Sequence, residues 1–363
     1  MEMDTMKRLD WLDALKGLGI AFIVMGHIVG AWCHLGTGIS SQVAMLAYKY
    51  FYAFHVPLFF VIAGMTFKQR PWGAFLKGLW QRLCVPYFIF GVLSILIYWA
   101  LYSIIVPIVL SHDAAGFYAN KTEVQTLGEQ LLLLVRGGTG AGSFVANSVL
   151  WFIPALMAVM VFARVVIPWV KQRWGWLIVV GVSLLVSCFI PWNDFAWLPW
   201  GLYLIPKYLP FLALGCWLGT TTEVFASKWQ RGIVAMGLIV VFGVIAIWNP
   251  WQYYPKVLWQ HLFNFVVTGG NILGWVLLSQ TFNLSAVVRY WGRQSMGIML
   301  MHKFPVLLIQ HFIPMTRSLF VGSLIIGMGG CFLVFVIAMA MTCVACWVIG
   351  RFAPWMLGER NHK

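Results

Sequence analysis

The chain has 363 residues, of which 61% are hydrophobic and only 9% are charged, whereas soluble domains carry about 25% charged residues. This composition excludes an ordinary soluble domain, and the high hydrophobicity excludes a disordered chain. The net charge of +14 would indicate nucleic-acid binding in a soluble protein. Here the basic residues lie between apolar runs, so membrane topology explains them and no nucleic-acid partner is expected.

Ten apolar runs of helical length predict an all-α fold, a polytopic bundle of about ten transmembrane helices in a lipid bilayer. The runs are continuous rather than alternating, which excludes an outer-membrane barrel. No internal repeat or linker separates them, so one membrane domain is expected over residues 1–363. The predicted spans are residues 17–35, 45–67, 83–110, 148–170, 174–190, 203–219, 232–248, 257–280, 295–313 and 319–350.

The distribution of Lys and Arg orients these spans. If the N-terminus is cytoplasmic, the segments on the inner side contain 17 of the 24 Lys and Arg residues, as the enrichment of these residues in cytoplasmic loops requires. Both termini are therefore predicted to be cytoplasmic. The first run lacks a signal-peptide cleavage site and is expected to stay as a helix. One larger outer loop is predicted at residues 111–147.

The seven cysteines lie mainly within or at the ends of the apolar runs, which makes a disulfide framework improbable. Cys343 and Cys346 form a C-x-x-C pair, but no second pair of ligands accompanies it. We therefore expect no metal site and interpret these cysteines as helix packing.

Ionisable residues at mid-membrane depth are costly and indicate function. His27 follows Lys16 by eleven residues, which is about 16 Å along a helix and almost three full turns. Asp13 precedes Lys16 by three residues, so the three side chains are expected on one helix face. We interpret His27, Asp13 and Lys16 as the candidate catalytic group.

Two further histidines are predicted at a similar depth. His55 lies thirteen residues before Lys68, and His302 lies nine residues after a basic residue of the preceding loop. Pro57 and Pro305 follow these histidines closely and are expected to break their helices at the level of a shared cavity. In the alternative interpretation, each histidine forms a local hydrogen bond to a neighbouring helix.

A basic cluster follows the second predicted span. It consists of Lys68, Arg70, Lys77 and Arg82. These residues either determine topology or bind an anionic, phosphate-bearing ligand on the cytoplasmic side, for which clustered Lys and Arg are suited.

The segment from Arg8 to His27, with ten residues between Lys16 and the histidine, resembles the first helix of the acyltransferase-3 family of membrane O-acyltransferases. Four further segments match that family in the same order. They are His55 to Gly64, Leu150 to Pro154, Lys207 to Phe211 and Gly292 to His302. The chain is most similar to the branch known as fucose 4-O-acetylase-like.

The resemblance implies an enzyme of the bacterial inner membrane that moves an acyl group, usually acetyl, from cytoplasmic acyl-CoA to a hydroxyl of a cell-surface or lipid-linked glycan. No bound cofactor is implied, since acetyl-CoA is the donor substrate. His27 would act as a general base on the hydroxyl or would carry the acyl group itself. The basic cluster would hold the CoA phosphates.

The chain departs from the family pattern at several positions. Lys16 stands where arginine is commonest, Ala63 stands where serine is usual, and Leu79 occupies the first position of an Arg-x-x-Arg motif whose second position is Arg82. A different function class also fits mid-membrane histidines, namely a secondary transporter or flippase of a sugar or lipid-linked intermediate. Release of free CoA distinguishes the two, because only the acyltransferase consumes acyl-CoA.

Overall fold

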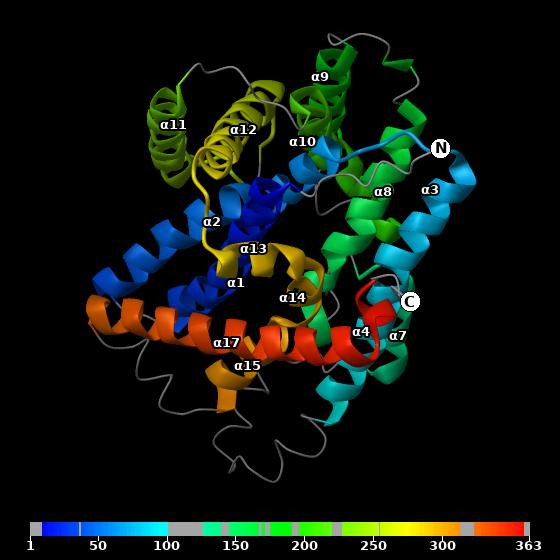
Figure 1. The fold of residues 1–363 in the computed structure, drawn as a ribbon, viewed down its shortest axis with the longest axis vertical. Helices are drawn as coiled ribbons and strands as arrows, with labels where there is room; N and C mark the ends of the chain where they lie inside the picture. Colours follow the sequence, from blue (N-terminus) through cyan, green and yellow to red (C-terminus); the bar gives the residue numbers. More distant parts are fainter. Residues whose placement is uncertain are drawn as a thin grey trace. The chain divides into compact units, whose positions relative to one another are not determined.

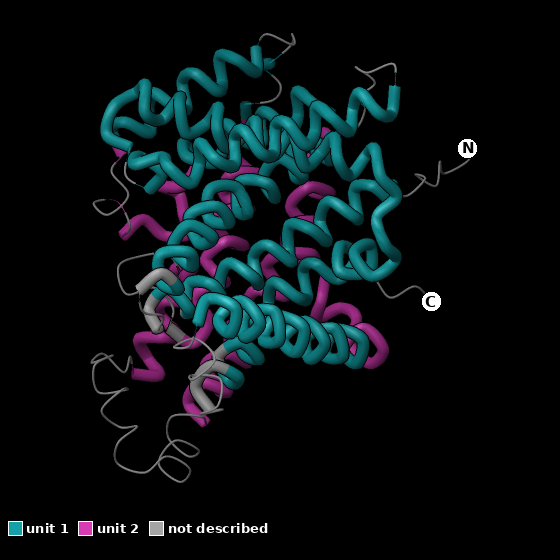
Figure 2. The backbone as a smooth tube through the Cα atoms, turned by 90° about the vertical axis from the view of Figure 1, so that its left-hand side faces the viewer, with its two compact units in different colours: residues 1–68, 166–189, 206–348 teal, residues 69–165, 190–205, 349–363 magenta. Residues whose placement is uncertain are grey.

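The computed structural model describes residues 9–35, 38–100, 126–138, 145–166, 169–170, 175–190, 195, 197–219, 227–253, 255–312 and 323–358. The regular elements in these residues are helices, which confirms the all-α prediction (Figure 1). The chain divides into two compact units (Figure 2). The first comprises residues 1–68, 166–189 and 206–348, and the second comprises residues 69–165, 190–205 and 349–363.

The first unit contains the elements that carry the predicted histidines. Its helices are α1 (Asp10–Leu35), α2 (Gly38–Met65), α9 (Gly175–Ser187), most of α10 (Ile205–Leu218), α11 (Lys228–Trp248), α12 (Leu258–Thr281), α13 (Ala286–Arg293), α14 (Ser295–Met301), α15 (Lys303–Phe312) and most of α17 (Leu324–Phe352).

Helices α1 and α2 form an antiparallel hairpin. Gly19 near the start of α1 faces Leu58, whereas Gly30 near its end faces Tyr48. The paired positions therefore run in opposite directions along the two helices. As a result, the first turns of α1 lie beside the last turns of α2.

Glycines allow two further helices to approach this hairpin closely. A Cβ atom on Gly17 would overlap the Val288 carbonyl of α13, and one on Gly292 would overlap the Asp13 carbonyl of α1. Small residues are common where helices cross in a membrane. Lipid tails are as apolar as the side chains, so helix association there depends on close van der Waals contact. Figure 1 shows α13 lying along α1, and α11 beside α12.

The expected break at Pro57 is wrong. Helix α2 continues through this residue, although the proline has no N–H to donate to the Ala53 carbonyl four residues earlier. The Thr268 hydroxyl of α12 donates to that carbonyl instead, at 3.0 Å. A threonine on a neighbouring helix thus satisfies the freed group, which lets a membrane helix retain a proline.

Eight helices in the described residues are long and apolar enough to cross a membrane. The predicted span at residues 174–190 corresponds to α9, an apolar helix of only 13 residues. The predicted span at residues 295–313 is divided at His302 into α14 and α15. Pro305 lies in the first turn of α15, where its missing N–H interrupts no bond. The number of ten spans stays a prediction.

The second unit is built around a helix that begins earlier than expected. Its elements are α3 (Trp72–Leu79), the π turn η1 (Trp80–Cys84), α4 (Val85–Ala100), α7 (Leu127–Val135), the 3₁₀ segments η3 (Val145–Trp151), η5 (Pro199–Leu204) and η6 (Pro354–Leu357), and α8 (Phe152–Val166). Together, α3, η1 and α4 form one 29-residue apolar segment. Lys77 and Arg82 consequently lie on helical turns, not in the loop that their charge indicated.

Part of the predicted outer loop is also helical. Helix α7 begins with a capping box in which the Thr126 hydroxyl accepts from the Glu129 N–H and the Glu129 carboxylate accepts from the Thr126 N–H. The Tyr87 hydroxyl of α4 donates to the Leu134 carbonyl at 2.7 Å, which fixes α7 against α4. Residues 111–125 and 139–144 of this loop lie outside the described residues.

Candidate functional site

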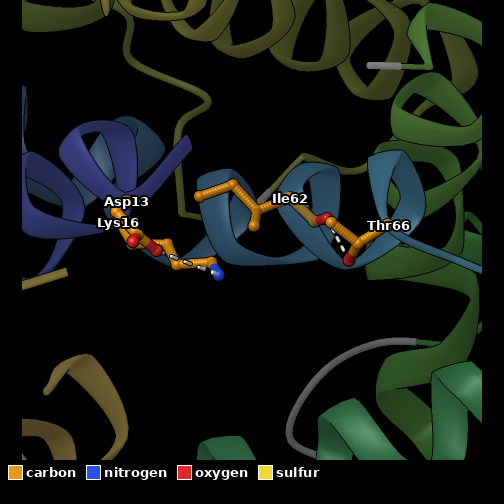
Figure 3. Close-up of polar contacts among 4 residues, drawn as sticks. All are labelled: Asp13, Lys16, Ile62 and Thr66. Atoms are coloured by element: carbon orange, nitrogen blue, oxygen red, sulfur yellow. Dashed lines mark hydrogen bonds and ion pairs between the residues drawn. The ribbon is translucent and has the colours of Figure 1, made fainter. Parts of the chain in front are cut away.

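Asp13 and Lys16 form an ion pair one turn from the start of α1. The Lys16 Nζ atom lies 3.9 Å from Asp13 Oδ1, and the Asp13 side chain is buried while that of Lys16 is half-buried. Figure 3 shows this pair together with the end of α2, where the Thr66 hydroxyl donates to the Ile62 carbonyl at 2.9 Å. The pair is held at this end of the hairpin because Gly292 lets α13 cover the Asp13 backbone.

His27 lies about three turns further along α1 and is partly exposed. Its Nδ1 atom is 3.2 Å from the Tyr52 hydroxyl of α2, and the two rings meet edge to face with centroids 6.0 Å apart. The neighbouring Gly26 leaves room for Tyr52, since a Cβ there would already touch the tyrosine ring at 3.4 Å. The His27 ring is therefore oriented by a single hydroxyl group.

His302 lies next to His27 in space, with ring centroids 5.4 Å apart. It occupies the break between α14 and α15 and is fully buried. Its Nδ1 is 2.9 Å from the Ile298 carbonyl, which only accepts, so the neutral ring carries its proton on Nδ1. The lone pair is then on Nε2, which has no hydrogen-bond partner among the described residues.

His55 is buried and also lies against Tyr52. Its Nδ1 donates to the Phe51 carbonyl at 2.6 Å, and its ring packs edge to face against Tyr52 with centroids 4.7 Å apart. The structure thus places His27 and His55 against Tyr52, and His302 against His27. His55 and His302 each bond to the main-chain carbonyl four residues earlier, not to a neighbouring helix as the alternative interpretation expected.

Of the three imidazoles, His27 is the one suited to meet a substrate. It is partly exposed, whereas His55 and His302 are buried. Its Nδ1 atom pairs with the Tyr52 hydroxyl, which can donate or accept and so permits either tautomer. The geometry allows proton transfer at His27, with His302 presenting a second lone pair beside it. Within the described part of the chain, no group of three or more His, Cys, Asp or Glu side chains has the arrangement of a metal site.

The basic cluster lies mainly in the second unit. Lys68 belongs to the first unit, while Arg70, Lys77 and Arg82 belong to the second, and all four are exposed. Arg164 of α8 joins them, because its guanidinium donates to the Arg70 carbonyl at 2.9 and 3.2 Å. It also lies 4.9 Å from the centre of the Trp72 ring, within cation–π distance.

Tyr52 and Arg164 were not singled out from the sequence. Tyr52 precedes His55 by three residues, so helical spacing alone places both on one face of α2. This spacing could have identified Tyr52 from the sequence. The contact between Arg164 and Arg70 had no such signal, since it joins α8 to the loop before α3, 94 residues away in sequence.

A comparison with family models matches residues 9–351 to an acyltransferase domain. The chain belongs to the acyltransferase-3 family. The chain is also similar to the inner membrane protein YcfT of Escherichia coli (strain K12), with 26% identity over 259 residues. That match spans 64% of this chain and 63% of the relative, so less than two thirds of the relative's length is covered. No solved structure matches.

The matched domain spans most of the chain, and eight helices in the described residues are long and apolar enough to cross a membrane. The matched residues include Asp13, Lys16 and the three histidines, as well as the basic cluster.

Proposed function

We propose that this acyltransferase moves an acetyl group from cytoplasmic acetyl-CoA to a hydroxyl of a cell-surface or lipid-linked glycan, in the inner membrane of a bacterium. The observation that carries the proposal is the position of His27. It is a partly exposed imidazole on an apolar helix, fixed by Tyr52 and adjacent to His302, in a chain of the acyltransferase-3 family. An ionisable group in such a helix indicates function.

The proposed reaction needs one base. In the tautomer with the proton on Nδ1, His27 donates to the Tyr52 oxygen and leaves Nε2 free to take the proton of the acceptor hydroxyl. The acceptor oxygen then bonds to the thioester carbonyl carbon, and the carbon–sulfur bond breaks. The departing CoA thiolate takes the proton from the imidazolium, which returns His27 to its neutral form. The products are the O-acetyl ester and free CoA.

The donor is proposed to bind through the positive groups. Arg70, Lys77, Arg82 and Arg164 lie in the second unit and are suited to phosphate oxygens, because guanidinium and ammonium groups form short, charge-assisted hydrogen bonds with them. Lys16 is already paired with Asp13 and is proposed to order the start of α1.

The experiment measures CoA release and acetylated product with purified protein in lipid nanodiscs. We expect His27→Ala to lower the rate by at least about 100-fold, the usual contribution of a general base. His27→Gln keeps a polar side chain without basicity and is expected to be equally inactive. His261→Ala, at a half-buried histidine of α12, is the control and is expected to keep wild-type activity.

Wild-type rates in His27→Ala, in protein that inserts and accumulates normally, would remove His27 from the mechanism. Sugar movement across the membrane without any release of CoA would favour a transporter and contradict the proposal.

A further inference from the structure

Three tyrosines form a cluster where α2 meets the connection between α11 and α12. Tyr48 and Tyr52 lie one turn apart on α2, with ring centroids 4.0 Å apart, and the Tyr253 ring lies 6.4 Å from that of Tyr48. The next residue to Tyr253, Gln252, donates through Nε2 to the Lys49 carbonyl at 2.8 Å. This hydrogen bond fixes the connection between α11 and α12 to α2, and so holds Tyr253 near the other two tyrosines.

The tyrosine cluster extends from His27 in the direction away from Lys16. Tyr52 packs at Gly26 and Tyr48 at Gly30, which is one turn further along α1. Lys16 lies about three turns from His27 in the other direction. His27 therefore lies between the ion pair at one end of α1 and the aromatic rings at the other. This arrangement suits a transferase whose two substrates reach the imidazole from opposite sides.

Two buried hydrogen-bond acceptors accompany the rings. Within the described residues, Oε1 of Gln252 and Nε2 of His302 are both buried without a hydrogen-bond partner. Buried polar atoms normally have a hydrogen-bond partner, so the absence of one at each of these two atoms requires an explanation. One acceptor lies beside Tyr253 in sequence and the other beside His27 in space. A ligand that brings O–H donors would satisfy both atoms.

Aromatic rings with a few polar groups are the usual lining of small-molecule sites. The face of an aromatic ring is electron-rich and attracts the weakly positive C–H groups of a saturated ring. A pyranose offers such C–H groups on its faces and hydroxyl donors around its edge. A phosphate or another anion would bind poorly here, because the unpaired atoms of Gln252 and His302 are acceptors and have no proton to donate to it.

We propose that Tyr48, Tyr52, Tyr253 and Gln252 form the acceptor subsite, which holds a pyranose ring so that one of its hydroxyls reaches His27 and the neighbouring Nε2 of His302. This inference rests on the proposed function and adds to it the residues that would recognise the sugar. Tyr253, which is 37% exposed, is the entrance to the subsite, and Tyr52 is its inner end.

The test measures sugar binding without any donor. Protein in phosphatidylcholine nanodiscs is titrated with methyl α-D-glucoside, methyl α-D-mannoside, methyl β-D-galactoside and methyl α-L-fucoside, and tryptophan fluorescence reports binding, since Trp251 adjoins the cluster. For the sugar that binds, we expect Tyr253→Ala and Gln252→Leu each to raise the Kd by about 10-fold. Tyr253→Phe keeps the ring and is expected to bind within about threefold of wild type.

Trp248→Ala is the control, because this neighbouring aromatic is 73% exposed and belongs to the end of α11. Thermal unfolding of every variant shows whether it is folded. Equal affinity of wild type, Tyr253→Ala and Gln252→Leu for the sugar would overturn the subsite, as would the absence of binding by all four sugars to the wild type.

A parallel measurement separates this proposal from the proposed function. If the wild type binds a sugar through Tyr253 and Gln252 but never releases CoA from acetyl-CoA, the acyltransfer proposal fails and the subsite stands. If CoA release is stimulated by phosphatidylglycerol in the nanodisc and by none of the sugars, the acceptor is a lipid polyol and the sugar subsite is wrong.

Discussion

At the scale of single residues, Tyr52 contacts two of the three histidines. Its hydroxyl is 3.2 Å from Nδ1 of His27, and its ring packs edge to face against His55. When His27 becomes an imidazolium during the proposed reaction, its Nδ1–H donates to the Tyr52 oxygen, and a hydrogen bond from a charged donor is stronger than a neutral one. Tyr52 is therefore expected to act as a positioning residue for His27.

Tyr52→Phe tests this role, because it removes the hydroxyl and keeps the ring packing. We expect kcat to fall by about 3- to 10-fold, the value of one hydrogen bond of this kind, with little change in the KM for acetyl-CoA. The measurement is steady-state CoA release over a range of pH. Tyr50→Phe is the matched control, since Tyr50 lies on the same helix but packs toward Gly243 of α11. Equal losses in kcat for both variants would show that the Tyr52 hydroxyl has no special role.

At the scale of elements, α2 and α12 are joined at the site of Pro57. The proline frees the Ala53 carbonyl, and the Thr268 hydroxyl donates to it at 3.0 Å. This hydrogen bond joins α12 to α2 at a position two residues before His55. It keeps α2 helical at the level where His55 and Tyr52 must face α1.

We expect Thr268→Val to lower the free energy of unfolding by about 0.5–2 kcal/mol, as for other hydrogen bonds between membrane helices. The cost should be smaller in a Pro57→Ala background, because alanine restores an N–H that bonds to the Ala53 carbonyl. Unfolding in mixed detergent measures both. Thr281→Val is the control, since that hydroxyl donates within its own helix to the Leu277 carbonyl. Identical costs with and without Pro57 would contradict the interpretation.

At the scale of the whole molecule, the orientation in the membrane decides which substrate meets which end of α1. Helix α11 has 21 residues, so it is about 31 Å long and matches the hydrocarbon core. Lys228 begins this helix, and Lys256 follows it in the connection to α12. Both residues are exposed.

The Lys and Arg distribution predicts that Lys228 faces the cytoplasm and Lys256 the outside. Introduced singly into a cysteine-free variant, Lys256→Cys should react with a membrane-impermeant maleimide in intact cells. Lys228→Cys should react only after the membrane is permeabilised. The reverse pattern would invert the topology and place the proposed donor end on the outer side.

Much of the fold follows from local properties of the chain. Apolar runs of about 20 residues become helices because a backbone in lipid must satisfy its own hydrogen bonds. The Asp13–Lys16 pair follows from helical spacing alone. Local reasoning failed at Pro57, where a threonine from a distant helix supplies the missing donor. It also failed at Lys77 and Arg82, because charge indicated a loop where apolar neighbours extend the helix.

The sequence by itself determined the helical class, the membrane environment and the candidate residue His27, since these depend on composition and on periodicity within single segments. Only the tertiary structure decided what surrounds His27. Its contacts with Tyr52 and His302 join three separate elements of the chain, and no period in the sequence relates these positions. Glycines also set how closely the elements of this unit pack, because a Cβ at Gly17 or Gly292 would hold α1 and α13 apart.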